Sequence, residues 1–262
     1  MMRPFFFGKA NKPLFGMLHP PGKASRARGA AVVCPPFGPE YVRAHRALRE
    51  LAQRLAADGL CTVRFDYYGT GDSSGREDEG SPEQWLDDID AALLEAKEAG
   101  EGGGVCLVGL RLGAALAALA SLRRHDIERL VLWDPVVVGS TYHTELLQRH
   151  RALVAERPRP KGYHVPDLPT ELLGSPVTPS VRAFFESLDL LTVEPLPVRR
   201  VCVVCSDANP SSERLAARLR EQGSDVHLAH SPGHRVWRKE DEFFRTLVPQ
   251  APIDTIASWL SP

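Results

Sequence analysis

Apolar residues in this chain form short runs that alternate with amphipathic stretches from about residue 30 to residue 135. The short apolar runs predict buried strands at residues 30–34, 60–66, 105–109 and 127–133. Apolar positions at helical spacing predict helices at residues 44–57, 87–99 and 112–124. Because strands and helices alternate, the pattern indicates β-α-β units, and hence an α/β fold with a mostly parallel sheet.

Both ends of the chain extend this sheet. Residues 3–8 and 14–18 are apolar runs joined by a turn-like segment, which favours an antiparallel hairpin at the sheet edge. Towards the other end, the pattern predicts strands at residues 200–205 and 226–230, a helix at residues 211–222, and a helical C-terminal stretch.

Residues 139–196 lack the regular alternation and contain seven prolines among helical pieces at residues 144–154 and 181–191. Irregular insertions between sheet strands commonly cover a binding pocket. We therefore expect residues 1–138 and 197–262 to form the core, with residues 139–196 as a cap or lid. A simple surface elaboration is the alternative interpretation of this segment.

Composition limits the class of partner. The chain is 43% hydrophobic and 25% charged with a formal net charge of -1, which argues against general disorder and against nucleic-acid binding. No apolar run approaches the roughly 20 residues of a membrane span, and Phe5–Phe7 is too short for a signal-peptide core. We expect a cytoplasmic protein that binds a small-molecule substrate or ligand.

The cysteines give no sign of metal or redox chemistry. Most of the five lie within apolar runs, where a reduced cysteine behaves as a small hydrophobic residue. Cys202 and Cys205 form a C-x-x-C pattern, but no second pair with ligand spacing accompanies it. We expect no metal site and no cofactor.

One candidate site lies where the strand at residues 105–109 runs into a helix of small residues, through Gly109-Leu-Arg-Leu-Gly113. In the G-x-S-x-G elbow, a serine nucleophile occupies the centre of such a tight strand-to-helix turn. Here the central residue is Arg111. Because a guanidinium stays protonated and is not a nucleophile, an acyl-enzyme cannot form at this position.

The order of elements and several short phrases resemble the α/β-hydrolase superfamily. Within it, the chain resembles the serine-aminopeptidase-like branch, and more narrowly the second type of exosortase A system-associated hydrolase. The phrases that carry the resemblance are Pro35-Pro-Phe-Gly-Pro-Glu40, Phe65-Asp-Tyr-Tyr-Gly69, Gly109-Leu-Arg-Leu-Gly113 and Leu132-Trp-Asp-Pro135. The resemblance implies a mostly parallel eight-stranded sheet with helices on both faces and a helical lid, with the serine nucleophile replaced by Arg111.

The resemblance also assigns site residues. The triad of this fold follows the order nucleophile, acid, histidine, which places the acid at Asp207 and the base at His234. The oxyanion hole corresponds to the backbone N–H groups of Phe37 and Leu112. Asp134, at the end of the preceding strand, is a second candidate acid or a partner for Arg111.

Three roles for Arg111 remain open on sequence grounds: an internal salt bridge that fills the site, recognition of a substrate carboxylate or phosphate, and a part in proton transfer. Three functions follow. The first is non-covalent acid–base catalysis by His234 and Asp207 on a small acyl or carboxylated substrate. The second is weak esterase or thioesterase activity through histidine-activated water, and the third is a non-catalytic binding protein in an acyl-chain or exopolysaccharide pathway.

Overall fold

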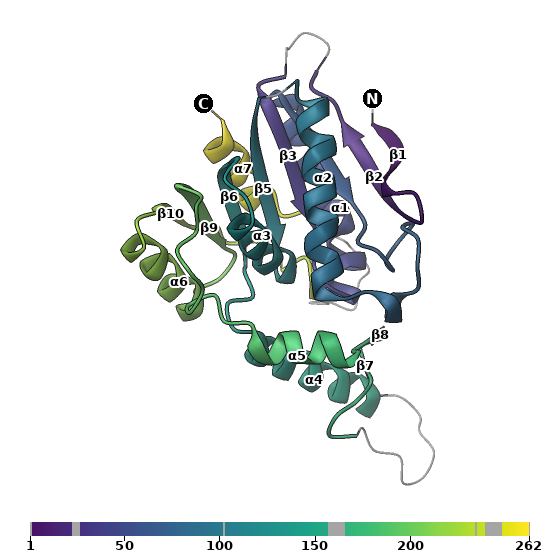
Figure 1. Ribbon diagram of the computed structural model, residues 1–262. Helices are drawn as coiled ribbons and strands as arrows, with labels where there is room; N and C mark the ends of the chain where they lie inside the picture. The colour runs from purple at the N-terminus through teal and green to yellow at the C-terminus, as the bar shows by residue number, and fades with distance from the viewer. Residues whose placement is uncertain are drawn as a thin grey trace.

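A computed structural model describes residues 2–22, 27–101, 103–156, 166–233, 235–238 and 248–261. Its centre is an eight-stranded sheet with the strand order β1-β2-β4-β3-β5-β6-β9-β10 (Figure 1). The strands are β1 Arg3–Lys9, β2 Lys12–His19, β3 Gly29–Cys34, β4 Leu60–Phe65, β5 Gly104–Leu110, β6 Ile127–Trp133, β9 Arg200–Cys205 and β10 Asp225–His230.

The strand directions confirm the predicted fold class. β1 pairs with β2, and β2 with β4, in antiparallel fashion, whereas all other pairings in the sheet are parallel. The hairpin at the sheet edge is thus confirmed. Central strands such as β3 are apolar at every position because both of their faces are covered by helices.

Two hydrophobic layers hold helices to the sheet. On one face, α2 Pro82–Ala99, α3 Leu112–Leu122 and α6 Pro210–Glu221 cover alternate strand residues such as Val105 and Leu107. On the other face, α1 Pro39–Ala57 and α7 Gln250–Leu260 cover the residues between them, including Cys106 and Val108. Figure 1 shows α2 and α3 in front of the sheet and α1 behind it.

Helix α1 begins five residues earlier than the predicted range of 44–57. Pro39 lies in its first turn, where proline costs no hydrogen bond, and Glu40 follows, where the helix dipole favours an acid. The earlier start carries Glu40 to the carboxyl end of β3.

The segment between β6 and β9 lies at the carboxyl ends of the strands. It contains α4 Gly139–Ala155, α5 Pro179–Ser187, and a short hairpin of β7 Glu171–Leu172 and β8 Ser175–Pro176. A bridge between Val138 and Asp189 joins the ends of the segment. In Figure 1, α4 and α5 lie together below the sheet.

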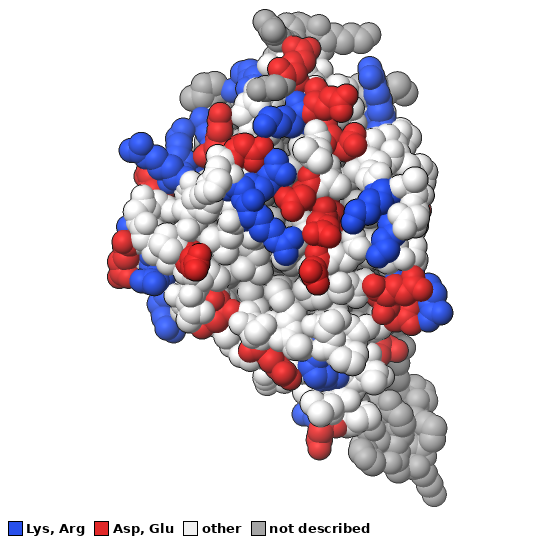
Figure 2. Space-filling view, in the orientation of Figure 1, with Lys and Arg blue, Asp and Glu red and all other residues white. Residues whose placement is uncertain are grey.

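Charges of both signs share the face of the molecule that Figure 2 presents. Figure 2 shows Lys and Arg side chains interspersed with Asp and Glu over the face that it presents. Among the described residues, no helix combines the length and the apolar character that crossing a membrane requires.

Candidate functional site

Arg111 is the single residue between the end of β5 and the start of α3. Its backbone has φ 56° and ψ −119°, a left-handed conformation that a residue with a side chain rarely adopts. Neighbouring backbone holds it there: its N–H donates to the carbonyl of Trp133 at 3.0 Å, and its carbonyl accepts from Val136 at 3.2 Å. Such a strained turn is typical of functional positions.

The Arg111 side chain is buried and engaged by acids. The residue is only 8% exposed. Its Nη2 donates to Oε2 of Glu145 on α4 at 2.8 Å, and its Nε lies 3.5 Å from Oε2 of Glu40 on α1. The rings of Tyr142 and Trp237 lie 5.3 and 5.2 Å from the guanidinium carbon, within cation–π range.

Two further arginines complete what we call the arginine cluster, formed by Arg111, Arg149, Arg238, Glu40 and Glu145. Arg149 donates to Glu40 Oε1 at 3.1 Å, and Arg238 donates to Glu145 Oε1 at 2.9 Å. The cluster joins the start of α1, the start of α3, helix α4 and the segment around residue 238. Of the roles left open for Arg111, the geometry favours the internal salt bridge, whose partners are Glu40 and Glu145 rather than Asp134.

Burial and charge act in opposite directions within the cluster. Complete burial raises the pKa of the Glu40 carboxyl, while Arg111, Arg149 and the Tyr142 hydroxyl oppose that rise. Burial also raises the pKa of Glu145, but Arg111 and Arg238 outweigh it, so that this pKa is lowered. For Arg111, burial works against the charged form, yet Glu40, Tyr142 and Glu145 raise its pKa above the ordinary value. Arg111 is therefore a permanent cation in the site.

The two candidate aspartates have other partners. Asp134, with a left-handed φ of 43°, accepts hydrogen bonds from the Ser206 backbone at 2.8 Å and from its hydroxyl at 2.7 Å. Asp207 forms an ion pair with Arg235, and its side chain is about half exposed. His234 lies outside the described residues, so that its pairing with Asp207 stays a prediction.

Asp134 should give the protein a measurable pH dependence. Burial raises the pKa of Asp134 from 3.8 to about 6, although the Ser206 hydrogen bonds oppose the shift. A folded-state pKa above the unfolded one means that the protonated carboxyl stabilises the fold at low pH, and that this contribution is lost as the pH rises through about 6.

We therefore expect the free energy of unfolding of the wild type, minus that of the Asp134→Asn variant, to fall by about 2 kcal/mol between roughly pH 4 and pH 7. Urea denaturation of both proteins at a series of pH values measures this difference. A difference that stays constant or grows with pH would contradict the prediction.

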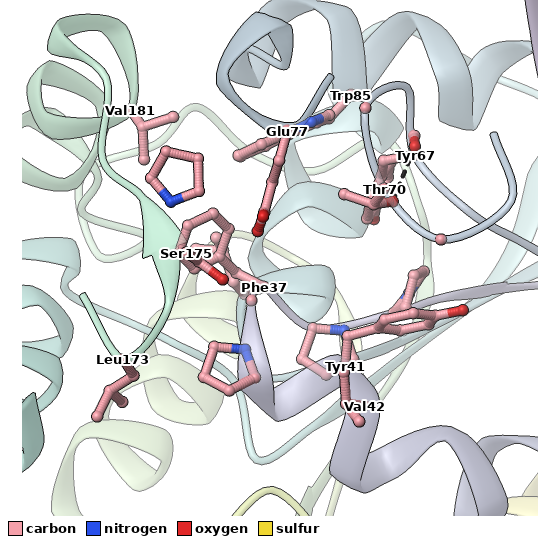
Figure 3. A pocket seen from close by; sticks show the side chains of 18 of the residues that line it. Phe37, Tyr41, Val42, Tyr67, Thr70, Glu77, Trp85, Leu173, Ser175 and Val181 are labelled. Atoms are coloured by element: carbon pink, nitrogen blue, oxygen red, sulfur yellow. Dashed lines mark hydrogen bonds between the residues drawn. The ribbon is translucent and has the colours of Figure 1, made fainter. Parts of the chain in front are cut away.

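A cavity of about 380 Å³ opens beside the strand-to-helix turn (Figure 3). Its walls come from the loop after β3, the loop after β4, the first turns of α3, and the β7–β8 hairpin with α5. The lining residues are Pro35, Pro36, Phe37, Gly38, Pro39, Tyr41, Val42, Tyr67, Gly69, Thr70, Gly71, Glu77, Trp85, Leu112, Leu116, Leu173, Gly174, Ser175, Pro176 and Val181.

The two residues predicted to supply oxyanion donors, Phe37 and Leu112, both line this cavity. Within the described ranges, neither backbone amide has a hydrogen-bond acceptor. Both amides are therefore available as donors to a ligand oxygen or to water. Arg111 does not line the cavity, because its side chain turns instead towards α1 and α4.

The described cysteines are free and buried. Burial raises the pKa of Cys202 to about 12 and that of Cys205 to about 11, which makes both poor nucleophiles. Across the part of the chain that the structure describes, no group of three or more His, Cys, Asp or Glu side chains could hold a metal ion.

Several residues of the site were missed from sequence, among them Glu40, Glu145, Glu77 and Trp85. Glu40 had a signal, since Pro39-Glu40 is a helix start that leads directly from the end of a strand. The other three lie in a polar helix or loop or on an amphipathic helix, and nothing in their local pattern distinguishes them from structural or surface residues.

The fold and the strand-to-helix turn define a protein of the α/β-hydrolase fold. Comparison with family models agrees, since the model described as serine aminopeptidase, S33 matches residues 27–178, more than half of the chain. The chain therefore belongs to the serine aminopeptidase S33 family.

Solved structures show the same fold. A putative hydrolase from Agrobacterium vitis S4 is 22% identical, with 99% of this chain and 97% of that chain covered and a TM-score of 0.61. Est1E from Butyrivibrio proteoclasticus, solved with ferulic acid, is 15% identical, with 98% and 96% covered and a TM-score of 0.68. The Pyrococcus furiosus esterase Pf2001 is 12% identical, with 99% and 90% covered and a TM-score of 0.65. No curated protein matches the chain.

Proposed function

We propose that this protein is a non-catalytic member of its family that binds a small apolar ligand in the cavity beside Arg111. Arg111 stands where the family has its serine nucleophile, and the narrower resemblance to exosortase-associated hydrolases suggests an acyl-chain or exopolysaccharide pathway in the cytoplasm. The observation that carries the proposal is the arginine cluster. The Arg111 guanidinium is paired with Glu40 and Glu145, while the neighbouring cavity stays open.

Engagement of Arg111 disfavours the two catalytic alternatives. Acid–base catalysis with Arg111 needs its guanidinium to face the substrate, but its donors point to Glu40 and Glu145. Asp207 is paired with Arg235, which competes with its predicted role of orienting His234. Activation of water by His234 would need that same orienting acid.

Residues 139–196 act as a lid in this proposal. Leu173, Ser175 and Val181 of this segment line the cavity together with Phe37 and Leu112. A ligand between them would be enclosed by apolar side chains, with a neutral carbonyl oxygen accepting from the backbone amides of Phe37 and Leu112. A mostly apolar lining with a few placed hydrogen-bond donors is typical of a small-molecule site.

The first test concerns covalent chemistry. We expect no burst of product from p-nitrophenyl butyrate and no label from a fluorophosphonate probe, because the elbow carries no nucleophile. The absorbance of released p-nitrophenolate measures the burst, and intact-protein mass spectrometry measures the label. Stoichiometric labelling that maps to a serine would overturn the non-catalytic assignment, as would steady ester turnover that His234→Ala abolishes.

The second test concerns binding. We expect methyl octanoate to bind wild-type protein in titration calorimetry and to bind the Val42→Trp variant at least about tenfold more weakly, because the indole narrows the cavity rim. Val42 is 74% exposed, so that the fold should tolerate the change. Leu94→Trp, also at an exposed position but away from the cavity, is the matched control. Equal affinity for the two variants would place binding elsewhere.

A further inference from the structure

We propose that the ligand of this cavity carries a cationic, ammonium-type end that pairs with Glu77, joined to an apolar body. This inference rests on the proposed binding function and specifies the class of ligand. Among the described residues that line the cavity, Glu77 is the one with a charged side chain. These lining residues include no lysine and no arginine.

Glu77 is held in a position that leaves its carboxylate available. It opens the short 3-10 helix η1, Glu77–Glu79, whose other two acids are already engaged. Arg76 forms an ion pair with Asp78, and its backbone N–H donates to Glu79 at 2.9 Å. No hydrogen bond or ion pair of the Glu77 carboxylate occurs within the described ranges, and Figure 3 shows the side chain extending into the cavity near Phe37 and Ser175.

An anionic ligand would meet this carboxylate without any compensating cation on the wall. The nearby arginines of the cluster do not line the cavity and are committed to Glu40 and Glu145. A negative end group would therefore be repelled at the cavity, whereas a positive one would be attracted. Of the ligands expected from sequence, the structure thus favours an acyl compound over a carboxylate.

The aromatic walls support the same choice. Trp85 lies between Phe37 and Tyr67, with ring centroids 5.8 and 6.0 Å away, and all three line the cavity together with Tyr41. Aromatic side chains next to a carboxylate are the usual surroundings of a bound ammonium group.

The test compares three eight-carbon probes that differ at one end: octyltrimethylammonium, 1-octanol and octanoate. We expect calorimetry to show the ammonium probe binding wild-type protein about tenfold more tightly than octanoate, with octanol between them. In Glu77→Gln this preference should shrink to about twofold or less, and in Glu77→Lys it should reverse. Glu83→Gln, at an exposed position on α2 outside the cavity, should keep the wild-type order.

The outcomes separate this inference from the proposed function. If octanol and octanoate bind as tightly as the ammonium probe, or if Glu77→Gln retains the full preference, the inference fails while the binding function stands. If none of the probes and no methyl octanoate binds to wild-type protein, the binding function fails together with it. Because Glu77 is exposed, its variants should keep the circular dichroism spectrum and unfolding midpoint of the wild type.

Discussion

Replacing Arg111 with methionine is expected to destabilise the protein by about 3 to 5 kcal/mol. Methionine fills much of the same volume but removes the cation that faces Glu40 and Glu145. Glu40 is fully buried, so that it would lose one of its two arginine partners and keep only Arg149. A buried carboxylate that loses its counter-ion keeps its desolvation cost without the compensating attraction, which is why breaking a buried ion pair typically costs about 3 to 5 kcal/mol.

Urea denaturation followed by circular dichroism measures this effect. The matched control is Arg123→Met, which removes an arginine paired with Asp87 where both side chains are more than 40% exposed. We expect that change to cost less than about 1 kcal/mol, since exposed ion pairs contribute little. A comparable loss in both variants, or a loss below about 1 kcal/mol for Arg111→Met, would contradict the buried-cluster interpretation.

A second substitution, at Glu40, measures the interaction energy between Arg111 and Glu40. In the double variant Arg111→Met with Glu40→Gln, the orphaned carboxylate is replaced by a neutral amide. We expect the double variant to be less destabilised than the sum of the two single variants, because residues that share one ion-pair network couple strongly. Strict additivity would mean that Arg111 stabilises the fold through packing alone.

The sequence predicted the sheet well because the signals of its strands are local. β3, β5 and β9 are buried at almost every position, so that each appears as a short continuous apolar run. The edge hairpin of β1 and β2 was equally visible, since a turn separates two short runs. Helix starts were less exact: α1 begins at Pro39, where a proline and an acid rather than apolar periodicity mark the first turn.

The site was only partly predictable, because most of the contacts that form it join residues far apart in the sequence. Arg111 stands out because a local motif surrounds it, and Phe37 and Leu112 follow from the same motif. Its partners could not be found in that way, since Glu40 on α1 and Glu145 on α4 are distant in sequence and meet Arg111 only in the folded chain. Nothing in the polar sequence around Glu145 distinguishes a cluster residue from an exposed one.

The arginine cluster also explains why an arginine is tolerated at a strained turn. Residue 111 has a left-handed backbone that hydrogen bonds to Trp133 and Val136 hold in place. Pairing with acids from α1 and α4 offsets the burial of the charge and ties α4 to the turn at the end of β5. Arg111 thus connects the strand-to-helix turn to both α1 and α4.

The glycines that flank Arg111 should be as important for stability as the arginine itself. We expect Gly113→Ala to destabilise the protein by at least about 3 kcal/mol, the upper end for overpacking, because the new methyl group meets backbone. A Cβ at Gly113 would lie 2.3 Å from the Pro35 carbonyl oxygen and 2.4 Å from that of Cys34. These atoms belong to the end of β3 and its loop, which cannot move without disturbing the centre of the sheet.

Gly109→Ala should have a similar effect from the other side of the turn. Its Cβ would lie 2.3 Å from the Gly113 carbonyl oxygen and 2.4 Å from the Ala114 Cα, at the start of α3. Gly22→Ala is the control, since no atom lies within 4 Å of the added methyl group, and we expect it to change stability by less than about 0.5 kcal/mol.

Urea denaturation of the three variants measures the differences in their free energies of unfolding. For a variant that does not fold, the yield of soluble protein is measured instead. Because the turn also positions the Leu112 amide at the cavity, a Gly113→Ala protein that still folds should bind methyl octanoate more weakly than Gly22→Ala does. If Gly113→Ala and Gly109→Ala were as stable as the control, the close approach of α3 to β3 would not be required. The two glycines would then be incidental to the elbow.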